Sequence, residues 1–466
     1  MKHTLLTTFV LALCGTGCPC AATPAEPSGD VAQPVCAAGD TVQLDQSSPS
    51  VQPEKFSFYQ PNAFALRYTA GRVLALDSYV KSWLKEKETH SASIEMQWDM
   101  HQKAVAYARQ HAEAPEPDWL AYARDYNYPT FTLGLRYNFN HGTTMHRDAK
   151  DWGEDMEVDY TTRLGDVVTP YGRFDRPLWR TRHWGGGYYM GAGCGYSMTH
   201  YDKEHNIDNE LIGTHFNIFF TAGLFVDWFF AKDVALEAGI DFAHHSNGAL
   251  YRPNKGSNYL GPFVGLKYAP QASETRTQRP AATMAAEEPW RKHPLFAEVS
   301  LGVGAKTLSE DWQNTQFSHN PQDPDYRTGD FNVYGAFSLQ ADLMYRYARR
   351  WASGLGVDVF YGDYAERVQY WEDKLEAPTH ISPWSLAVAL KHEAYYGRLS
   401  VRVGIGYYLY RHMGTVAKLV EQPYYERVGL FYTLSKKTGL SVGFSVNAHK
   451  TRADFTELQL ACPIRL

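Results

Sequence analysis

The chain has 466 residues and a net charge of −6, with 45 Lys and Arg against 51 Asp and Glu, a balance that does not suit a nucleic-acid-binding protein. Hydrophobic residues make up 44% of the chain, which excludes disorder over most of its length. No apolar run of roughly 18 residues follows the N-terminus, so membrane-spanning helices are excluded as well. The 32 Tyr, the 37 Gly and the many short alternating segments are instead typical of a transmembrane β-barrel.

The N-terminus has the features of an export signal. A short positive start precedes the apolar stretch 5–13, and small residues then continue to Ala22. We predict a cleaved secretory signal peptide over 1–22. Residues 23–54 are rich in Pro, Ser, Ala and Gln and predict a flexible leader. The cysteines that follow the signal are too far apart to form a disulfide framework or a metal motif.

From residue 64 onward the chain shows the period of two that strands require. We predict a first β-rich half over 55–270 and a second over 293–466, separated by a polar linker or long loop over 271–292. A helical insertion is predicted at about 99–124. Strands of the first half are expected at 64–76, 90–98, 129–140, 168–174, 183–200, 212–229, 233–246 and 258–268. Strands of the second half are expected at 294–308, 331–348, 352–367, 382–393, 397–411, 424–435, 439–449 and 453–464.

Two all-β architectures fit these strands. We expect a single antiparallel transmembrane β-barrel of about 14–16 strands, because neither half has its own leader or an obvious closure signature. The alternative is two tandem eight-stranded barrels, each nearly solid, joined by 271–292. An even number of strands with periplasmic termini makes the seventh strand run outward, toward the outer leaflet.

The alternation within the strands is consistent with a membrane environment. In 212–228 the even positions are mostly apolar, as at Leu224 and Val226, whereas the odd positions include His215 and Asp227. A barrel in lipid turns the apolar set outward, and a soluble carrier of the lipocalin type turns it inward. Alternation alone fits both. The signal peptide, the number of strands and the Tyr and Trp residues near strand ends favour the membrane.

The segment 241–261 contains the candidate catalytic residues. His244 and Ser246 continue the apolar face of their strand, and Asn258 lies on the same face of the returning strand. Side chains two apart on a strand are neighbours, so the imidazole can approach the hydroxyl. A serine needs such a base, because its free hydroxyl is a weak nucleophile at neutral pH. On spacing alone, a His-x-Ser pair near a barrel rim is more often simple interfacial polarity.

The turn between these two strands offers groups that could hold a developing negative charge. Asn247, Gly248, Asn254 and Gly256 supply turn chemistry and amide donors. An amide NH2 or a backbone N–H at this place could stabilise an oxyanion. We therefore take these four residues as oxyanion or substrate candidates.

Two strings in this segment, HHSNG at 244–248 and RPNKG at 252–256, resemble the motif of the outer-membrane lipid A 3-O-deacylases, also called acyloxyacyl hydrolases. The resemblance implies an eight-stranded barrel with its active site on the outer wall, near the outer leaflet. Longer members with a second β-rich half are also similar, through YNYP at 126–129 and HKTRADFTE at 449–457.

The resemblance also implies roles for individual residues, namely His244 as general base, Ser246 as nucleophile and Asn254 as an oxyanion contributor. One position departs from the family pattern, because the family carries a Glu where this chain has Asn258. An Asn carbonyl can still accept a hydrogen bond from the imidazole, but it offers no negative charge to the imidazolium. Asp241 is predicted on the lumen face and is a poor substitute.

Other titratable groups give weaker signals, and the sequence implies neither a metal site nor a cofactor. His392 and Glu393 are consecutive on a strand and face opposite ways, so they cannot easily share an ion. His449 and Asp454 fit rim or lumen polarity. The acidic segment 148–159 lacks the ligand spacing of a calcium loop.

We therefore expect a serine esterase in the outer membrane of a Gram-negative bacterium, which removes an ester-linked acyl chain from lipid A, the lipid part of lipopolysaccharide. The alternative is a channel or structural barrel that has kept the motif without the chemistry, and Asn258 is its best support. A wide lumen lined by Arg402, Asp227 and His215 would strengthen that alternative.

Overall fold

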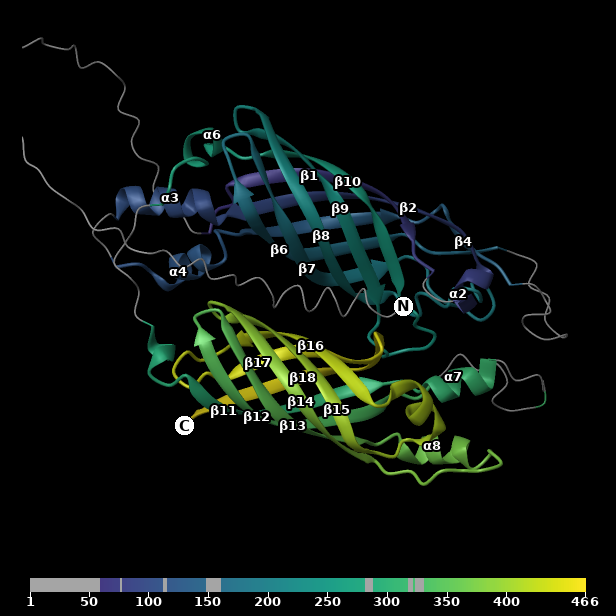
Figure 1. Ribbon diagram of the computed structural model, residues 1–466. Helices are drawn as coiled ribbons and strands as arrows, with labels where there is room; N and C mark the ends of the chain where they lie inside the picture. Colours follow the sequence, from purple (N-terminus) through teal and green to yellow (C-terminus); the bar gives the residue numbers. More distant parts are fainter. Residues whose placement is uncertain are drawn as a thin grey trace, which may run out of the picture. The chain divides into compact units, whose positions relative to one another are not determined.

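The computed structural model describes residues 59–75, 78–111, 115–147, 161–280, 288–316, 322 and 331–466. The predicted signal peptide, the leader and the acidic segment 148–159 lie outside the described residues. The described part of the chain contains two closed antiparallel β-barrels of eight strands each, coloured from purple to teal and from green to yellow in Figure 1.

The first barrel closes because its first strand pairs on both sides. β1 (Ala63–Val73) is antiparallel to β2 (Leu84–Asp99) on one side and to β10 (Ser257–Tyr268) on the other. Two short strands, β4 (Thr143–Met145) and β5 (Thr162–Arg163), extend the sheet beside β2. The other barrel strands are β3 (Thr130–Phe139), β6 (Val167–Arg180), β7 (Trp184–Ser197), β8 (Phe216–Ala231) and β9 (Val234–Ser246).

The second barrel closes in the same way. β11 (Leu295–Lys306) pairs with β12 (Tyr334–Ala348) and with the last strand, β18 (Arg452–Arg465). Every other strand pairs with its neighbours along the chain. These are β13 (Trp351–Gly362), β14 (Trp384–Tyr396), β15 (Leu399–Arg411), β16 (Tyr424–Thr433) and β17 (Ser441–His449).

Short helices occupy the connections. The side chain of Asp99 caps the longest of them by accepting hydrogen bonds from the backbone N–H groups of His101 and Gln102. Among the described residues, no helix combines the length and the apolar character needed to cross a membrane. The helices are α2 (Ser78–Trp83), α3 (Met100–Gln110), α4 (Asp118–Asp125), α6 (Ala272–Thr275), η1 (Pro289–Arg291), α7 (Ser309–Gln316), α8 (Ala365–Glu372), α9 (Gly414–Val416) and η2 (Ala417–Glu421).

The expected single barrel of about 14–16 strands is wrong, and the alternative of two tandem eight-stranded barrels is confirmed. β10 returns to β1 instead of continuing the sheet into β11, and β18 returns to β11. Closure satisfies the backbone groups of the edge strands, which lipid cannot do. Each of the sixteen predicted strand ranges overlaps a barrel strand, and the predicted helical insertion overlaps α3 and α4.

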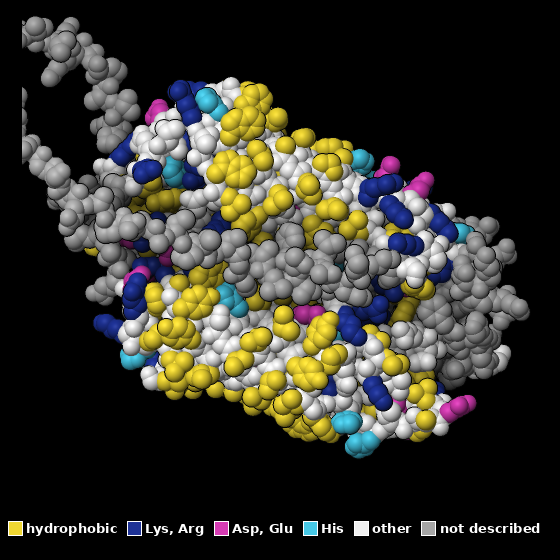
Figure 2. All heavy atoms as spheres, viewed as in Figure 1, with side chains coloured by type: hydrophobic (Ala, Val, Ile, Leu, Met, Phe, Trp, Pro, Cys, Tyr) yellow, Lys and Arg dark blue, Asp and Glu magenta, His cyan; other side chains and the backbone are white. Residues whose placement is uncertain are grey.

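The outward faces of the strands are apolar and the inward faces are polar. Along β1, Leu66 is 58% exposed, whereas its neighbour Arg67 is 7% exposed. Along β8, Leu224 is exposed and Asp227 is buried. Figure 2 shows the hydrophobic side chains spread over the outer walls. This is the arrangement of a barrel in lipid, as predicted, and it is the reverse of the arrangement in a lipocalin-type carrier.

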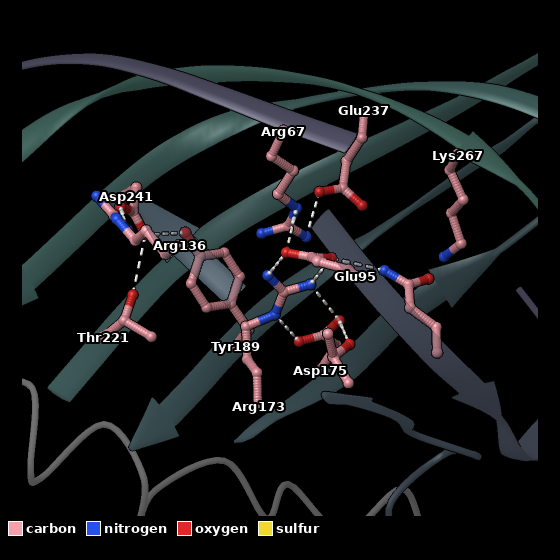
Figure 3. Close-up of polar contacts among 12 residues, drawn as sticks. Arg67, Glu95, Arg136, Arg173, Asp175, Tyr189, Thr221, Glu237, Asp241 and Lys267 are labelled. Carbon is pink, nitrogen blue, oxygen red and sulfur yellow. Dashed lines mark hydrogen bonds and ion pairs between the residues drawn. The ribbon is translucent and has the colours of Figure 1, made fainter. Parts of the chain in front are cut away.

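Buried ion pairs fill the first barrel (Figure 3). Glu95 accepts hydrogen bonds of 2.6 and 3.0 Å from the guanidinium of Arg173, which also donates to Asp175 at 2.6 Å. Arg67 pairs with Glu95 and with Glu237 of β9. Since buried charges are costly unless they are paired, this network fixes the strands in one arrangement.

A second group of lumen contacts surrounds Asp241 of β9 (Figure 3). Its carboxylate accepts hydrogen bonds from Arg136 at 2.6 Å, from Tyr189 at 2.5 Å and from Thr221 at 2.9 Å. Asp241 therefore lies on the lumen face, as predicted, and is engaged there. The cavity left among these side chains measures about 10 Å³, which is room for about one water molecule.

Charged side chains also fill the second barrel. Arg402 donates to Glu298 at 2.6 and 3.0 Å and to Glu393 at 2.9 Å. Lys391 and Arg427 both donate to Asp358, at 2.8 and 2.7 Å. The cavity among these residues measures about 30 Å³.

The three residues that were expected to line a wide channel all have partners of their own. Arg402 belongs to the ion-pair network just described, and Asp227 pairs with Lys267 at 3.6 Å. His215 Nδ1 lies 2.7 Å from the backbone carbonyl of Ser197, in the connection between β7 and β8. The wide lumen that the channel alternative requires is not found in the described part of the chain.

Two arginines of β1 test the importance of the lumen network. Arg67→Leu leaves the carboxylates of Glu95 and Glu237 buried without this partner, so we expect the free energy of unfolding to fall by about 3–5 kcal/mol. Arg72→Leu, on the exposed outer face of the same strand, should change it by less than about 1 kcal/mol. Urea unfolding in lipid vesicles, followed by Trp fluorescence, measures both. Equal stability of the two variants would contradict the prediction.

Candidate active site

The β9–β10 hairpin brings the three predicted residues onto one outward face. His244 of β9 lies opposite Asn258 of β10 in the strand register. Ser246 is the last residue of β9, two positions beyond His244, and lies opposite Ile218 of β8. The strands themselves therefore position all three side chains.

These side chains form a continuous hydrogen-bonded row. His244 Nε2 lies 2.9 Å from Ser246 Oγ, and His244 Nδ1 lies 2.8 Å from Asn258 Oδ1. An amide oxygen only accepts hydrogen bonds, so Nδ1 carries the proton and Nε2 is left to accept the serine hydroxyl. Ser246 is only 8% exposed. The row has the order hydroxyl, imidazole and amide, which is the order that a nucleophile, its base and an orienting group would require.

The neighbouring His245 points to the opposite side of the sheet. Its Nε2 lies 3.0 Å from Thr169 Oγ1, and its ring packs edge-on against Tyr259. It is completely buried. Of the two consecutive histidines, only His244 reaches Ser246, as the alternation of faces predicts.

The turn after β9 is held by its own asparagines. Asn254 Oδ1 accepts a hydrogen bond of 3.1 Å from the backbone N–H of Asn247, and Asn247 Nδ2 donates to the carbonyl of Tyr251. The first of these bonds engages the N–H of Asn247 and leaves Nδ2 as the donor of Asn254. Gly248 has a φ of +64°, a conformation that favours glycine.

Gly256 lies directly against the imidazole of His244. Its φ is +72°, and a Cβ atom at this position would lie 2.5 Å from Cε1 of His244. Its backbone N–H donates to the carbonyl of Leu211 at 3.0 Å, so it is engaged and does not face a substrate. Gly256, one of the four oxyanion or substrate candidates, thus forms a wall of the site beside His244.

Residues that no sequence motif indicates support this turn. Lys255 N donates to the carbonyl of Glu210, next to the bond between Gly256 and Leu211. Glu210 is completely buried and pairs with Arg147. These residues lie in separate connections and form no motif, so a pattern search along the chain had no signal that could have found them.

Charged side chains mark the level of the outer wall at which the site lies. Arg72 of β1 and Glu88 of β2 lie opposite each other on the outward face, and both are exposed. Arg72 also lies opposite Leu260, two residues along β10 from Asn258. Charge on a lipid-facing wall is costly except near the interface. Further along these strands the exposed outward residues are apolar, including Ile240, Val264, Leu266, Leu66 and Ile94.

A second Ser–His contact lies on the outer wall of the second barrel. Ser353 Oγ is 2.9 Å from His392 Nδ1, and the two residues are opposite each other in β13 and β14. Ser353 Oγ also lies 3.5 Å from the hydroxyl of Tyr347. The Nε2 atom of His392 has no hydrogen-bond partner among the described residues, so no third residue orients this imidazole. Glu393 faces inward to Arg402, on the opposite face of β14 from His392.

A cluster in the second barrel has the side-chain types of a metal site. The donor atoms of Glu421, His449 and Asp454 lie within 4.8 Å of one another. However, Lys306 already pairs with Asp454, and Arg411 pairs with Glu421. Because two cations balance the two carboxylates, an ion would have to displace them, and we assign no metal to this cluster.

Comparison with protein families identifies both halves of the chain. The family described as lipid A 3-O-deacylase (PagL) matches residues 80–267, from α2 to β10. The family described as acyloxyacyl hydrolase, C-terminal domain, matches residues 295–465, from β11 to β18. The chain is a two-part protein, with a lipid A 3-O-deacylase domain followed by an acyloxyacyl hydrolase C-terminal domain. The resemblance drawn from the 244–256 motif is thereby confirmed, and we call the two halves the deacylase barrel and the C-terminal barrel.

This is an outer-membrane β-barrel family whose activity is lipid A deacylation. A search of curated proteins found no match. An outer-membrane channel from Pseudomonas putida F1 is 8% identical over 89% of this chain and 100% of its own, with a TM-score of 0.20. The P. putida toluene transporter TodX is 10% identical over 87% and 90%, with a TM-score of 0.16. Such scores are too low to establish a shared fold.

The contact between Gly256 and His244 can be tested with alanine. In Gly256→Ala the new methyl group meets the imidazole, so we expect His244 to shift and lipid A deacylation to fall about 10²-fold. Gly397→Ala is the matched control, because Gly397 has nearly the same φ, +63°, with open space around its Cβ position. Fatty-acid release per folded molecule is the measurement. Similar losses in both variants would point to backbone strain instead of the contact.

Proposed function

We propose that this chain is a serine esterase of the outer membrane, exported by its N-terminal signal, that removes an ester-linked acyl chain from lipid A. The observation that supports this most is the hydrogen-bonded row of Ser246, His244 and Asn258 on the lipid-facing wall of the deacylase barrel. The substrate would be lipopolysaccharide in the outer leaflet. Its acyl chain would lie along outward apolar residues such as Leu260.

The first half of the reaction transfers the acyl group to the enzyme. Ser246 Oγ attacks the ester carbonyl carbon while its proton passes to His244 Nε2. The tetrahedral intermediate then breaks its bond to the lipid A oxygen, and the imidazolium returns the proton to that oxygen. The products are an acyl ester on Ser246 and a lipid A molecule with a free hydroxyl.

The second half releases the fatty acid. A water molecule gives a proton to His244 Nε2 as its oxygen attacks the acyl carbon. The bond to Ser246 Oγ breaks, and the proton returns from the imidazolium to the serine. The reaction consumes one water molecule and requires no cofactor.

The negative charge on the carbonyl oxygen needs donors in both halves. We assign this role to Nδ2 of Asn254 and to the backbone N–H of Gly248, which lie in the turn that follows Ser246. Removing one such donor typically costs 10²–10³ in kcat. Asn247 contributes by holding the carbonyl end of Asn254 in place.

Asn258 selects the imidazole tautomer. Its carbonyl oxygen accepts a hydrogen bond from Nδ1–H of His244, so Nε2 stays unprotonated and available as the base. An amide supplies no charge to offset the imidazolium, which makes proton transfer to His244 harder than it would be beside a carboxylate. This lack of charge at Asn258 favours the second candidate function, a structural barrel that retains the motif without turnover.

Lipid A from a Gram-negative host separates these functions. Mass spectrometry should show the loss of one acyl chain when the wild-type protein is expressed, and intact lipid A with Ser246→Ala. The expected loss in rate for Ser246→Ala is at least 10³-fold, because the nucleophile is removed. Unmodified lipid A in cells that hold folded wild-type protein would favour the structural barrel.

Ser353→Ala is the matched control for this experiment. It removes a serine that also contacts a histidine on an outer wall, but in the C-terminal barrel and without a third residue that orients the imidazole. We expect its lipid A to be deacylated like that of the wild type. Loss of activity in Ser353→Ala, with activity kept in Ser246→Ala, would move the reaction to the C-terminal barrel.

Substitutions of Asn258 test the third position. Asn258→Leu removes the acceptor for Nδ1, and we expect kcat to fall by about 10³–10⁴, the range seen when a triad loses the correct tautomer. Asn258→Glu adds a carboxylate that stabilises the imidazolium, so the acidic limb of the pH–rate profile should move to higher pH. Initial rates between pH 5 and 9 measure both effects. An Asn258→Leu enzyme with wild-type rates would remove Asn258 from the mechanism.

A further inference from the structure

The turn 247–256, which lies beside the proposed catalytic row of Ser246, His244 and Asn258, is hydrogen-bonded to the connection between β7 and β8, residues 198–215. The backbone N–H groups of Lys255 and Gly256 donate to the carbonyls of Glu210 and Leu211, both at 3.0 Å. Gly256 in turn lies against the imidazole of His244. The placement of residues 210–211 therefore sets the wall behind the proposed base.

A buried carboxylate fixes that placement. Glu210 Oε1 accepts hydrogen bonds from Arg147 Nη2 at 2.6 Å and from the hydroxyl of Tyr79 at 2.7 Å. The side chains of Glu210 and Arg147 are 0% and 3% exposed. Glu210 Oε2 lies 3.8 Å from Nζ of Lys255, inside the turn itself. Burial and the charge of Glu210 raise the pKa of Tyr79, so its hydroxyl keeps the proton that it donates.

Arg147 has further partners that hold its position. Its guanidinium stacks over the rings of Tyr79 and Trp83 of α2, at 5.2 and 5.1 Å. Its backbone N–H donates to Asp208 Oδ2 at 3.2 Å. Segments from α2, from the residues after β4 and from the β7–β8 connection thus converge on one carboxylate.

A buried ion pair of this kind contributes little net stability compared with apolar residues of the same size, and its better-supported effect is to specify one geometry. Here the geometry that it specifies includes the turn 247–256. The backbone N–H of His146 donates to the carbonyl of Trp83 at 2.8 Å, beside the pairing of β4 with β2, so α2 and the residues after β4 are already joined. The β7–β8 connection and the turn 247–256, by contrast, lie outside the barrel strands.

We infer that Glu210 is a positioning residue for the proposed esterase, which holds Gly256 against His244 through Arg147, Lys255 and its own backbone carbonyl. Glu210 touches neither the substrate nor the reacting atoms. The inference rests on the proposed function of Ser246 and His244, although the contacts of Glu210 are independent of it.

Glu210→Gln tests the inference because it keeps the shape of the side chain and removes its charge. We expect kcat for acyl release to fall about tenfold or more, with KM within twofold of the wild type, because substrate contacts are unchanged. A fluorophosphonate probe, which forms a P–O bond to an activated serine and releases fluoride, should label Ser246 more slowly by a similar factor.

Glu116→Gln is the matched control. Glu116 is also buried and pairs with an arginine, Arg124, at 2.6 Å, but it belongs to the α3–α4 segment and has no contact with the turn. Its kcat and its labelling rate should match those of the wild type. Equal losses in Glu116→Gln and Glu210→Gln would assign the effect to general destabilisation and overturn the inference.

Tyr79→Phe decides the case if Glu210→Gln fails to fold. It removes one hydrogen bond to Glu210 and keeps the ring, and we expect kcat to fall about threefold or more with KM unchanged. If Glu210→Gln folds and keeps the wild-type kcat, the positioning role is overturned and the proposed function is left intact. If Glu210→Gln does not fold, a wild-type kcat in Tyr79→Phe has the same meaning. A wild-type protein that neither deacylates lipid A nor reacts with the probe would instead overturn the proposed function.

Discussion

The interior of the deacylase barrel is filled by the barrel's own side chains, and this constraint decides where chemistry can occur in that half of the chain. In the deacylase barrel, Arg173, Glu95 and their partners occupy that interior. A substrate cannot enter, so any site for a lipid must lie on the outer wall or at the strand ends. The hydrogen-bonded row of Ser246, His244 and Asn258 lies at both, where the apolar outer face meets exposed charges such as Arg72.

The same location gives a physical meaning to the neutral third residue. A carboxylate on a lipid-facing wall carries a desolvation cost whenever its partner is neutral. Asn258 avoids that cost and still directs the Nδ1 proton of His244. In exchange, it gives no charge stabilisation to the imidazolium that forms during acyl transfer. The amide therefore favours a well-ordered resting site over rapid proton transfer.

Some groups of the site lie on paired strands and others lie in a turn. The register of β9 and β10 places the proposed base, nucleophile and orienting amide, and this depends on pairing between adjacent strands. The proposed oxyanion donors and the wall against the imidazole lie in the turn 247–256, which has no sheet pairing of its own. Its shape depends on internal contacts such as Asn247–Asn254 and on the buried pair of Glu210 and Arg147.

The sequence by itself determined the strands, the lipid-facing orientation and the row of His244, Ser246 and Asn258, because the period of two assigns each residue to a face without reference to distant parts of the chain. Only the tertiary structure decided that β10 closes on β1 and that the chain forms two barrels, since closure is a pairing between segments far apart in sequence. For the same reason the sequence does not predict the ion pair of Glu210 and Arg147, because the two residues lie in separate connections that come together only in the folded barrel. Local periodicity reports on neighbours along a strand, and these contacts are made between residues that are neighbours only in space.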